Sequence, residues 1–269
     1  MSFLDHLEEL RWHLIRSLIA IGVFTLLAFV SKSIVFGQII LGPSRVDFWT
    51  YRMLCRLGEA VGSNVLCIEE LPFVIQSRTM SGQFTMHLAA SFVIGLVLTF
   101  PYAFWEIWRF VKPGLYDQER QASTGAVFWV SLLFVAGVLF GYFGVAPLSV
   151  NFLANYQVDP AIVNEFDIRS YVSTLLMIVM ACALMFQLPA VIFVLSKAGL
   201  VTPLTLRFYR RHAAVVILVL SAIITPPDVV SQMLISAPIF LLYEVGIWIS
   251  GVVLRNKVKN QVDALQVRD

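Results

Sequence analysis

Long apolar runs separated by short charged segments dominate the pattern of this chain. The first run, residues 14–30, holds a single charged residue, Arg16, whose long side chain can reach the nearby membrane interface. Further runs of low charge are residues 88–105, 121–158, 171–196 and 212–254. About 20 predominantly apolar residues are needed for a helix to cross the hydrocarbon core of a bilayer. The pattern therefore predicts an all-α polytopic membrane protein.

The last of these runs is too long for one crossing and contains a turn. Pro226 and its neighbouring proline remove amide donors, and Asp228 can cap the helix that follows. The first arm of this hairpin, residues 213–224, reaches only about 18 Å at a rise of 1.5 Å per residue, against a hydrocarbon core of about 30 Å. Either the bilayer thins locally or the hairpin re-enters the same face.

We predict a single integral membrane domain with six spans. The spans are residues 14–30, 86–107, 122–147, 171–196, 212–225 and 229–250. An amphipathic helix at residues 1–13 precedes them, a long outer loop covers residues 31–85, and residues 251–269 form a tail. Prolines within or at the ends of spans bend helices, and the predicted product is a concave face of kinked helices. These prolines are Pro101, Pro147, Pro189 and Pro238.

Composition and charge agree with this class and orient the chain. Hydrophobic residues make up 59% of the chain and charged residues 13%, and the mean hydropathy is +0.82, which a soluble domain of this length does not show. Residues 1–11 lack the positive start and cleavage site of a signal peptide, so we expect the first span to remain in the mature protein. Placing both termini in the cytoplasm puts most of the 19 lysine and arginine residues on that side.

The outer loop carries two of the three cysteines. Cys55 and Cys67 lie on the side that is expected to be oxidising, where a disulfide would add about 3 kcal/mol of stability to a loop that we expect to have little core of its own. Two reduced, packed cysteines are an equally weighted alternative. Cys182 lies within a predicted span and is interpreted as a packing residue.

Two short charged segments carry the candidate chemistry. In residues 2–11 apolar side chains recur at helical spacing, and Glu9 lies among the charged positions. In residues 112–120 a Pro-Gly turn is followed by acids, including Glu119, at the start of a helix. A solvated face explains the first segment, and the helix dipole explains the second, without any ligand. The predicted orientation, however, places both segments on the same side of the membrane. There Glu9 and Glu119 form an acidic pair suited to a cationic ligand.

Other polar groups give weaker indications. Glu106, Glu244 and His87 lie near the ends of spans and are interpreted as structural, whereas Gln187 lies deeper and needs a polar partner. No nucleotide-binding, zinc-protease or Cys-x-x-Cys motif is present and the histidines are dispersed, so we expect no enzyme, no cofactor and no metal. A small secondary transporter is the alternative, although it would show internal repeats and intramembrane charges. A purely structural scaffold would leave the paired carboxylates unexplained.

Four segments of the chain resemble the TatC family of the twin-arginine protein translocase. They are HLEELR at 6–11, WRFVKPGLYDQER at 108–120, FQLP at 186–189 and TPPDVVSQ at 225–232. The resemblance implies a receptor and core subunit in the inner (plasma) membrane of a bacterium, or in an organellar membrane of bacterial descent. It also implies binding of twin-arginine signal peptides at cytoplasmic carboxylates, and export of folded proteins by the proton-motive force. The implied partners are single-span TatA/TatB-type subunits in a multi-copy complex and the lipid bilayer, with no nucleic acid.

The resemblance assigns roles by position. It implies signal-peptide binding by Glu9, Arg11, Phe110, Leu115 and Glu119. Partner-contacting or functionally sensitive positions are Pro43, Tyr142, Gln187, Pro226, Asp228 and Gln232. Family members carry a glutamate where this chain has Gln187, so a titrating carboxylate is absent there. The chemistry agrees, because a guanidinium matches a carboxylate with two parallel hydrogen bonds and an ammonium does not.

Overall fold

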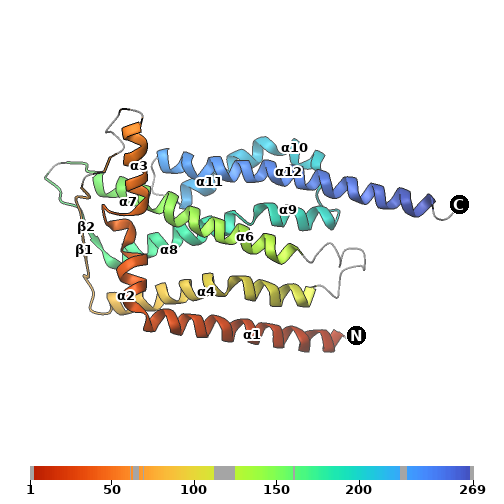
Figure 1. The fold of residues 1–269 in the computed structure, drawn as a ribbon, viewed down its shortest axis with the longest axis horizontal. Helices are drawn as coiled ribbons and strands as arrows, with labels where there is room; N and C mark the ends of the chain where they lie inside the picture. The colour runs from red at the N-terminus through yellow and green to blue at the C-terminus, as the bar shows by residue number, and fades with distance from the viewer. Residues whose placement is uncertain are drawn as a thin grey trace. The chain divides into compact units, whose positions relative to one another are not determined.

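The computed structural model describes residues 3–60, 62, 67–68, 70–111, 125–159, 161–224 and 229–266 of the 269. The described chain is largely helical and forms two compact units, Met1–Met180 and Ala181–Asp269, with the boundary inside a helix (Figure 1). The all-α polytopic membrane class predicted from hydropathy is confirmed.

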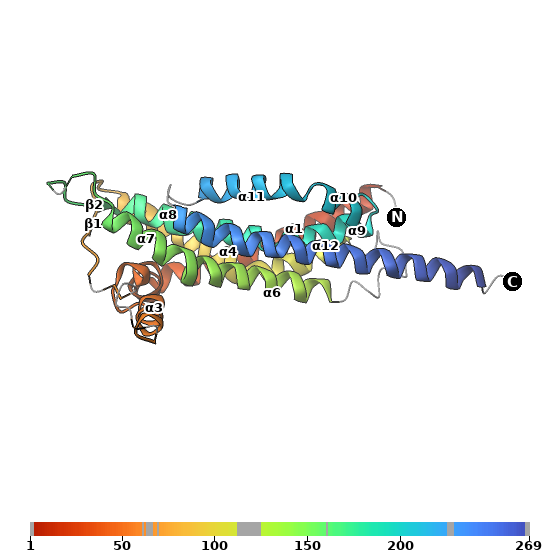
Figure 2. The same ribbon diagram turned by 90° about the horizontal axis from the view of Figure 1, so that it is seen from above.

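Unit 1 contains most of the elements. In chain order they are α1 (Phe3–Val30), α2 (Lys32–Ile34), π-helix η1 (Val35–Ile40), 3-10 helix η2 (Gly42–Ser44), α3 (Trp49–Ala60), strand β1 (Val74–Gln76), α4 (Gly82–Val111), α6 (Ala126–Leu139), π-helix η5 (Phe140–Val145), α7 (Ala146–Asn155), strand β2 (Glu165–Asp167) and most of α8 (Ile168–Met185). The long helices α1 and α4 lie side by side, and α3 runs across rather than along them (Figures 1 and 2).

Helices α1 and α4 are antiparallel. His13 near the start of α1 lies beside Phe110 at the end of α4, and Phe29 near the other end of α1 lies beside Phe84. No break separates the predicted amphipathic helix 1–13 from the predicted span 14–30, since α1 is continuous. The reason is local, because residues 8–20 contain neither glycine nor proline to end a helix.

Five helical stretches are long and apolar enough to cross a membrane within the described residues. They are Glu8–Val30, Gly82–Phe110, Val127–Asn155, Ile168–Lys197 and Gln232–Asn256. The predicted fifth span, residues 212–225, corresponds to α11 (Arg210–Ile224), whose 15 residues reach about 22 Å. The count of six crossings and the cytoplasmic placement of both termini are compatible with this arrangement and stay predictions.

The segment 31–85 is more ordered than its description as a long loop with little core. It contains α2, η1, η2, α3 and β1, and its Ile40 and Tyr51 are among the most buried side chains of the chain. Strand β1 pairs in parallel with β2, with Val74 opposite Glu165. The expectation of little core was wrong because the apolar side chains of this segment pack on α7 and η5, which are distant in sequence.

Unit 2 contains the end of α8 and four further helices, α9 (Leu188–Lys197), α10 (Pro203–Phe208), α11 (Arg210–Ile224) and α12 (Val229–Gln266). Helix α12 packs against α9, α10 and α11. The hydroxyl of Ser196 hydrogen-bonds that of Ser250 at 2.8 Å, and a Cβ at Gly246 would meet the tip of Ile192. Small residues thus bring α9 and α12 close together.

The four prolines occupy two kinds of position. Pro101 lies inside α4 and Pro238 inside α12, as expected for helix bending. Pro147 and Pro189 instead stand in the first turns of α7 and α9. Because α7 continues directly from η5, Pro147 leaves the carbonyl of Phe143 without its helical amide partner, and this carbonyl accepts from the Thr50 hydroxyl at 2.6 Å. The concave face stays a prediction.

Candidate functional site

Three of the five residues predicted for signal-peptide binding lie at one end of the α1–α4 pair. Glu9 is half-buried, and Arg11 is exposed with its guanidinium 5.7 Å from the centre of the Trp12 ring. Phe110 is half-buried at the end of α4, with its ring 6.5 Å from that of His13. Glu9 precedes His13 by four residues and so shares its face of α1, toward α4. Leu115 and Glu119 lie outside the described residues.

A polar cluster lies directly beneath this end. The carboxylate of Glu106, on α4, accepts a hydrogen bond from Nδ1 of His13 on α1. It also accepts one from the hydroxyl of Tyr102 at 3.0 Å, and Nη1 of Arg109 lies 4.0 Å away. Glu106 is only 1% exposed and His13 7%. The cluster therefore joins α1 to α4 one helical turn below Glu9 and Phe110.

Sequence reasoning missed this cluster. It interpreted Glu106 as a structural residue near the end of a span and assigned it no partner, whereas the side chain is enclosed between two helices and bonded to His13. Tyr102, Glu106 and Arg109 share one face of an otherwise apolar helix, a spacing that could have indicated a polar stripe. Its partner, His13, is 93 positions away.

A second cluster surrounds Pro43 and Tyr142 at the opposite end of unit 1. The Tyr142 hydroxyl, in the π-helix η5, donates to the carbonyl of Ile39, in the π-helix η1, at 2.8 Å. The Tyr51 hydroxyl contacts the carbonyls of Pro43 and Pro147 at 2.9 and 2.8 Å. Burial raises the pKa of Tyr51, so the phenol stays a donor. The structure thus brings Pro43 and Tyr142 together, and π-helical segments are frequent at functional sites.

The absence of a side chain at Gly42 allows Tyr142 and Phe48 to pack closely in this second cluster. A Cβ at Gly42 would lie 2.9 Å from the Tyr142 hydroxyl and 3.1 Å from Cε2 of Phe48. The Phe48 ring in turn packs edge-on against Tyr142 at 5.5 Å between centroids. A side chain at position 42 would therefore displace Tyr142 from Ile39.

The predicted residues of unit 2 are described only in part. Gln187 occupies the N-cap position of α9 beside Pro189, at the turn between α8 and α9. Gln232 donates from Nε2 to the carbonyl of Leu218 at 3.1 Å and so joins α12 to α11. Pro226 and Asp228 lie outside the described residues. The ion pair between Arg210 and Glu244, also missed from sequence, links α11 to α12.

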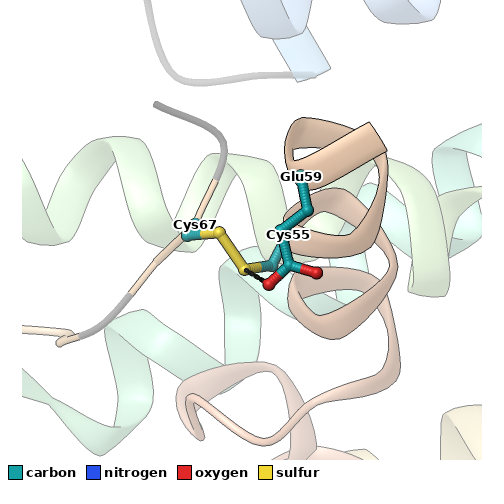
Figure 3. A group of neighbouring side chains, drawn as sticks. All are labelled: Cys55, Glu59 and Cys67. Atoms are coloured by element: carbon teal, nitrogen blue, oxygen red, sulfur yellow. Dashed lines mark hydrogen bonds between the residues drawn. A yellow bond between two sulfur atoms is a disulfide. The ribbon is translucent and has the colours of Figure 1, made fainter. Parts of the chain in front are cut away.

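The predicted cysteine pair is a disulfide in the structure. Cys55 of α3 and Cys67 are bonded, with their Cα atoms 4.2 Å apart, and Glu59 lies next to them (Figure 3). The three side chains lie close enough together to suggest a metal site. Cysteine binds a metal ion as a thiolate, however, and a disulfide offers none, so the bonded pair leaves only the Glu59 carboxylate as a ligand in this group.

These features define a polytopic helical membrane protein whose polar groups gather at both ends of its first helical unit. The chain belongs to the TatC family, because the family description "Sec-independent protein translocase protein (TatC)" matches residues 5–238. The recognition made from the four sequence segments is thereby confirmed.

Known relatives cover the chain almost completely. It is 36% identical to the Sec-independent protein translocase protein TatC of Blattabacterium sp. subsp. Periplaneta americana (strain BPLAN), over 96% of this chain and 97% of that one. It is 30% identical to the TatC of Aquifex aeolicus (strain VF5), over 97% and 99%. A crystal structure of the twin arginine translocase receptor TatC in DDM superposes with a TM-score of 0.69 at 30% identity, covering 91% of this chain and 99% of that chain.

A second crystal structure of the same receptor matches with a TM-score of 0.65 at 28% identity, over 93% and 99% of the two chains. The chain is therefore a multi-pass membrane protein of a protein translocase family. The alternative of a small secondary transporter is left without support.

Proposed function

We propose that this protein is the receptor and core subunit of a twin-arginine translocation system. It recognises signal peptides through carboxylates at the Glu9 end of the α1–α4 pair and, together with TatA/TatB-type single-span subunits, exports folded proteins across the inner membrane by the proton-motive force. Family membership and the similar crystal structures, described as twin arginine translocase receptors, support this proposal.

The observation that carries the proposal is the contrast between two acids near Phe110. Glu9 is half-buried at the helix end and can meet an incoming cation, whereas Glu106 below it is enclosed and already paired with His13. An accessible carboxylate on an apolar helix pair suits a ligand that combines arginines with an apolar segment. Glu119, on the segment that follows α4, is proposed as the second acceptor.

The chemistry of recognition favours arginine over lysine. A guanidinium can donate two parallel hydrogen bonds to one carboxylate, whereas an ammonium acts as a compact point charge. A charge-assisted hydrogen bond contributes about 1.5–3 kcal/mol when partly desolvated, and much less when fully exposed. The half-buried position of Glu9 is the kind of setting in which the larger value applies.

The proposal is tested by binding of a twin-arginine signal peptide and its twin-lysine counterpart to the purified protein in nanodiscs. Glu9→Gln keeps the shape of the side chain and removes its charge, and we expect the affinity for the arginine peptide to fall about 10- to 100-fold. Glu119→Gln should act in the same direction. The matched control is Glu8→Gln, which removes the same charge from the neighbouring, exposed position on another face of α1.

Two outcomes would contradict the proposal. Equal binding of the arginine and lysine peptides to the unmodified protein would leave the apolar segment as the only recognised element. Equal losses in Glu8→Gln and Glu9→Gln would reduce the effect to overall charge and remove Glu9 from the site.

A further inference from the structure

The buried cluster beneath Glu9 connects two helices whose ends carry the proposed site. Nδ1 of His13 donates across the α1–α4 interface to Oε2 of Glu106. The other carboxylate oxygen, Oε1, accepts from Tyr102 at 3.0 Å and lies 4.0 Å from the Arg109 guanidinium, both on α4 itself. Glu106 is thus held in one orientation by its own helix and presented to His13.

Burial decides what Glu106 does. Its side chain is 2% exposed, so an arginine of a signal peptide has no path to it, although it lies only one turn from Phe110. A carboxylate enclosed in this way loses most of its hydration, and well-placed partners have to offset that loss. The partners here join two helices that are distant in sequence. The arrangement of these partners therefore fixes the position of α1 relative to α4 and does not bind a ligand.

The His13–Glu106 pair lies where it can fix the positions of Glu9 and Phe110. Glu9 lies one turn above His13 on α1, and Phe110 lies one turn above Glu106 on α4, so the linked side chains stand directly below the two site residues. The His13 ring also packs beside the Phe110 ring. Further along, α1 and α4 are joined separately, by the Thr99 hydroxyl near the carbonyl of Ala20 at 3.4 Å. Loss of the pair would release the helix ends alone.

We infer that His13 and Glu106 are a positioning pair that sets the separation between Glu9 and Phe110, and with it the preference for arginine over lysine. This inference rests on the proposed function. Bidentate binding needs its carboxylate held within a fraction of an ångström, whereas a point charge tolerates a looser site. Loosening the helix ends therefore costs affinity for the arginine peptide and leaves affinity for the lysine peptide nearly unchanged.

The test uses the double variant His13→Leu/Glu106→Met, measured with both peptides. Replacing both partners by apolar side chains of similar volume leaves no buried charge, so the fold should be retained, while the directional hydrogen bond that fixes the ends of the two helices is lost. We expect the ratio of arginine to lysine affinity to fall about tenfold, with lysine-peptide binding within about twofold of the unmodified protein. The variant His13→Gln, which still offers a donor to Glu106, should rescue most of the ratio.

Thr99→Val is the matched control, because it removes a hydroxyl from the same helix interface about 10 Å from Glu106. A purely structural role predicts that Thr99→Val and the double variant lower the binding of both peptides alike, and that result would overturn the inference. Should the double variant fail to fold, Glu106→Gln carries the same test, with an expected fall of about threefold and an unchanged ratio as the contrary result.

The outcomes separate this inference from the function on which it rests. An unmodified protein without preference for arginine refutes the proposed function and the positioning role together. A preference that persists in the folded double variant refutes the positioning role alone and leaves the receptor intact.

Discussion

Gly95 is the position where a single methyl group should separate the two long helices of unit 1. A Cβ added there would lie 2.6 Å from the backbone nitrogen of Thr25 and 2.8 Å from its Cα, and would also meet its side-chain oxygen. Backbone atoms within a helix cannot move aside individually. The substitution Gly95→Ala therefore has to push α1 and α4 apart as whole helices.

The size of the effect follows from the contact distances. Ordinary contact requires an opening of about 1 Å, and a gap of that size removes about a quarter to a half of the attraction between facing atoms. Overpacking of this kind costs about 1–3 kcal/mol, which the better helix propensity of alanine offsets by about 1 kcal/mol. We expect Gly95→Ala to lower the free energy of unfolding by up to about 2 kcal/mol.

The control is Gly22→Ala on α1, where a Cβ would meet nothing within 4 Å. It should be neutral or stabilising by up to about 1 kcal/mol. Reversible unfolding by SDS in mixed micelles, followed by circular dichroism, measures both variants. If Gly95→Ala matched Gly22→Ala, the close contact between Gly95 and Thr25 would not exist in the folded protein and the reasoning would fail.

Two further predictions concern the other end of unit 1. Tyr51→Phe removes the donor shared by two buried proline carbonyls and should lower the free energy of unfolding by about 1–3 kcal/mol; an unchanged unfolding midpoint would exclude this role. The carboxylate of Asp167 accepts hydrogen bonds from the amides of Arg169 and Arg78, which hold its pKa below the usual value. The contribution of the Asp167 carboxylate to the free energy of unfolding is therefore fully present above its unfolded pKa of about 3.9. It is lost as the pH falls through the lowered pKa of the folded state. The stability difference between the unmodified protein and Asp167→Asn should be full near pH 6 and shrink below about pH 4, and a difference that stays constant over this range would contradict the assignment.

The candidate site was predictable in its residue types and not in its arrangement. Glu9 and Phe110 were singled out from sequence segments, and the structure places both at one end of the α1–α4 pair. Glu106 was interpreted only as a structural residue near the end of a span. The sequence does not show whether lipid, water or a neighbouring helix covers a residue at such a position. Only the register between α1 and α4 shows that His13 covers Glu106 and bonds its carboxylate.

The segment 31–85 shows the same limit at larger scale. From the sequence, a disulfide between its two cysteines and a pair of reduced cysteines had equal weight, and the structure shows the disulfide. Its core was missed because it depends on distant residues. The Tyr51 hydroxyl contacts carbonyls of η2 and α7, and the periodicity within the segment cannot predict a partner almost 100 positions away.

The sequence by itself determined the membrane class, the position of the long apolar helices and the family, because a helix in lipid must carry about 20 apolar residues whatever its neighbours are. The tertiary structure alone decided which polar groups meet, such as His13 with Glu106, or Tyr142 with the carbonyl of Ile39. The physical reason is that hydropathy is a property of each segment, whereas a buried hydrogen bond depends on the rotation and register of two segments packed together.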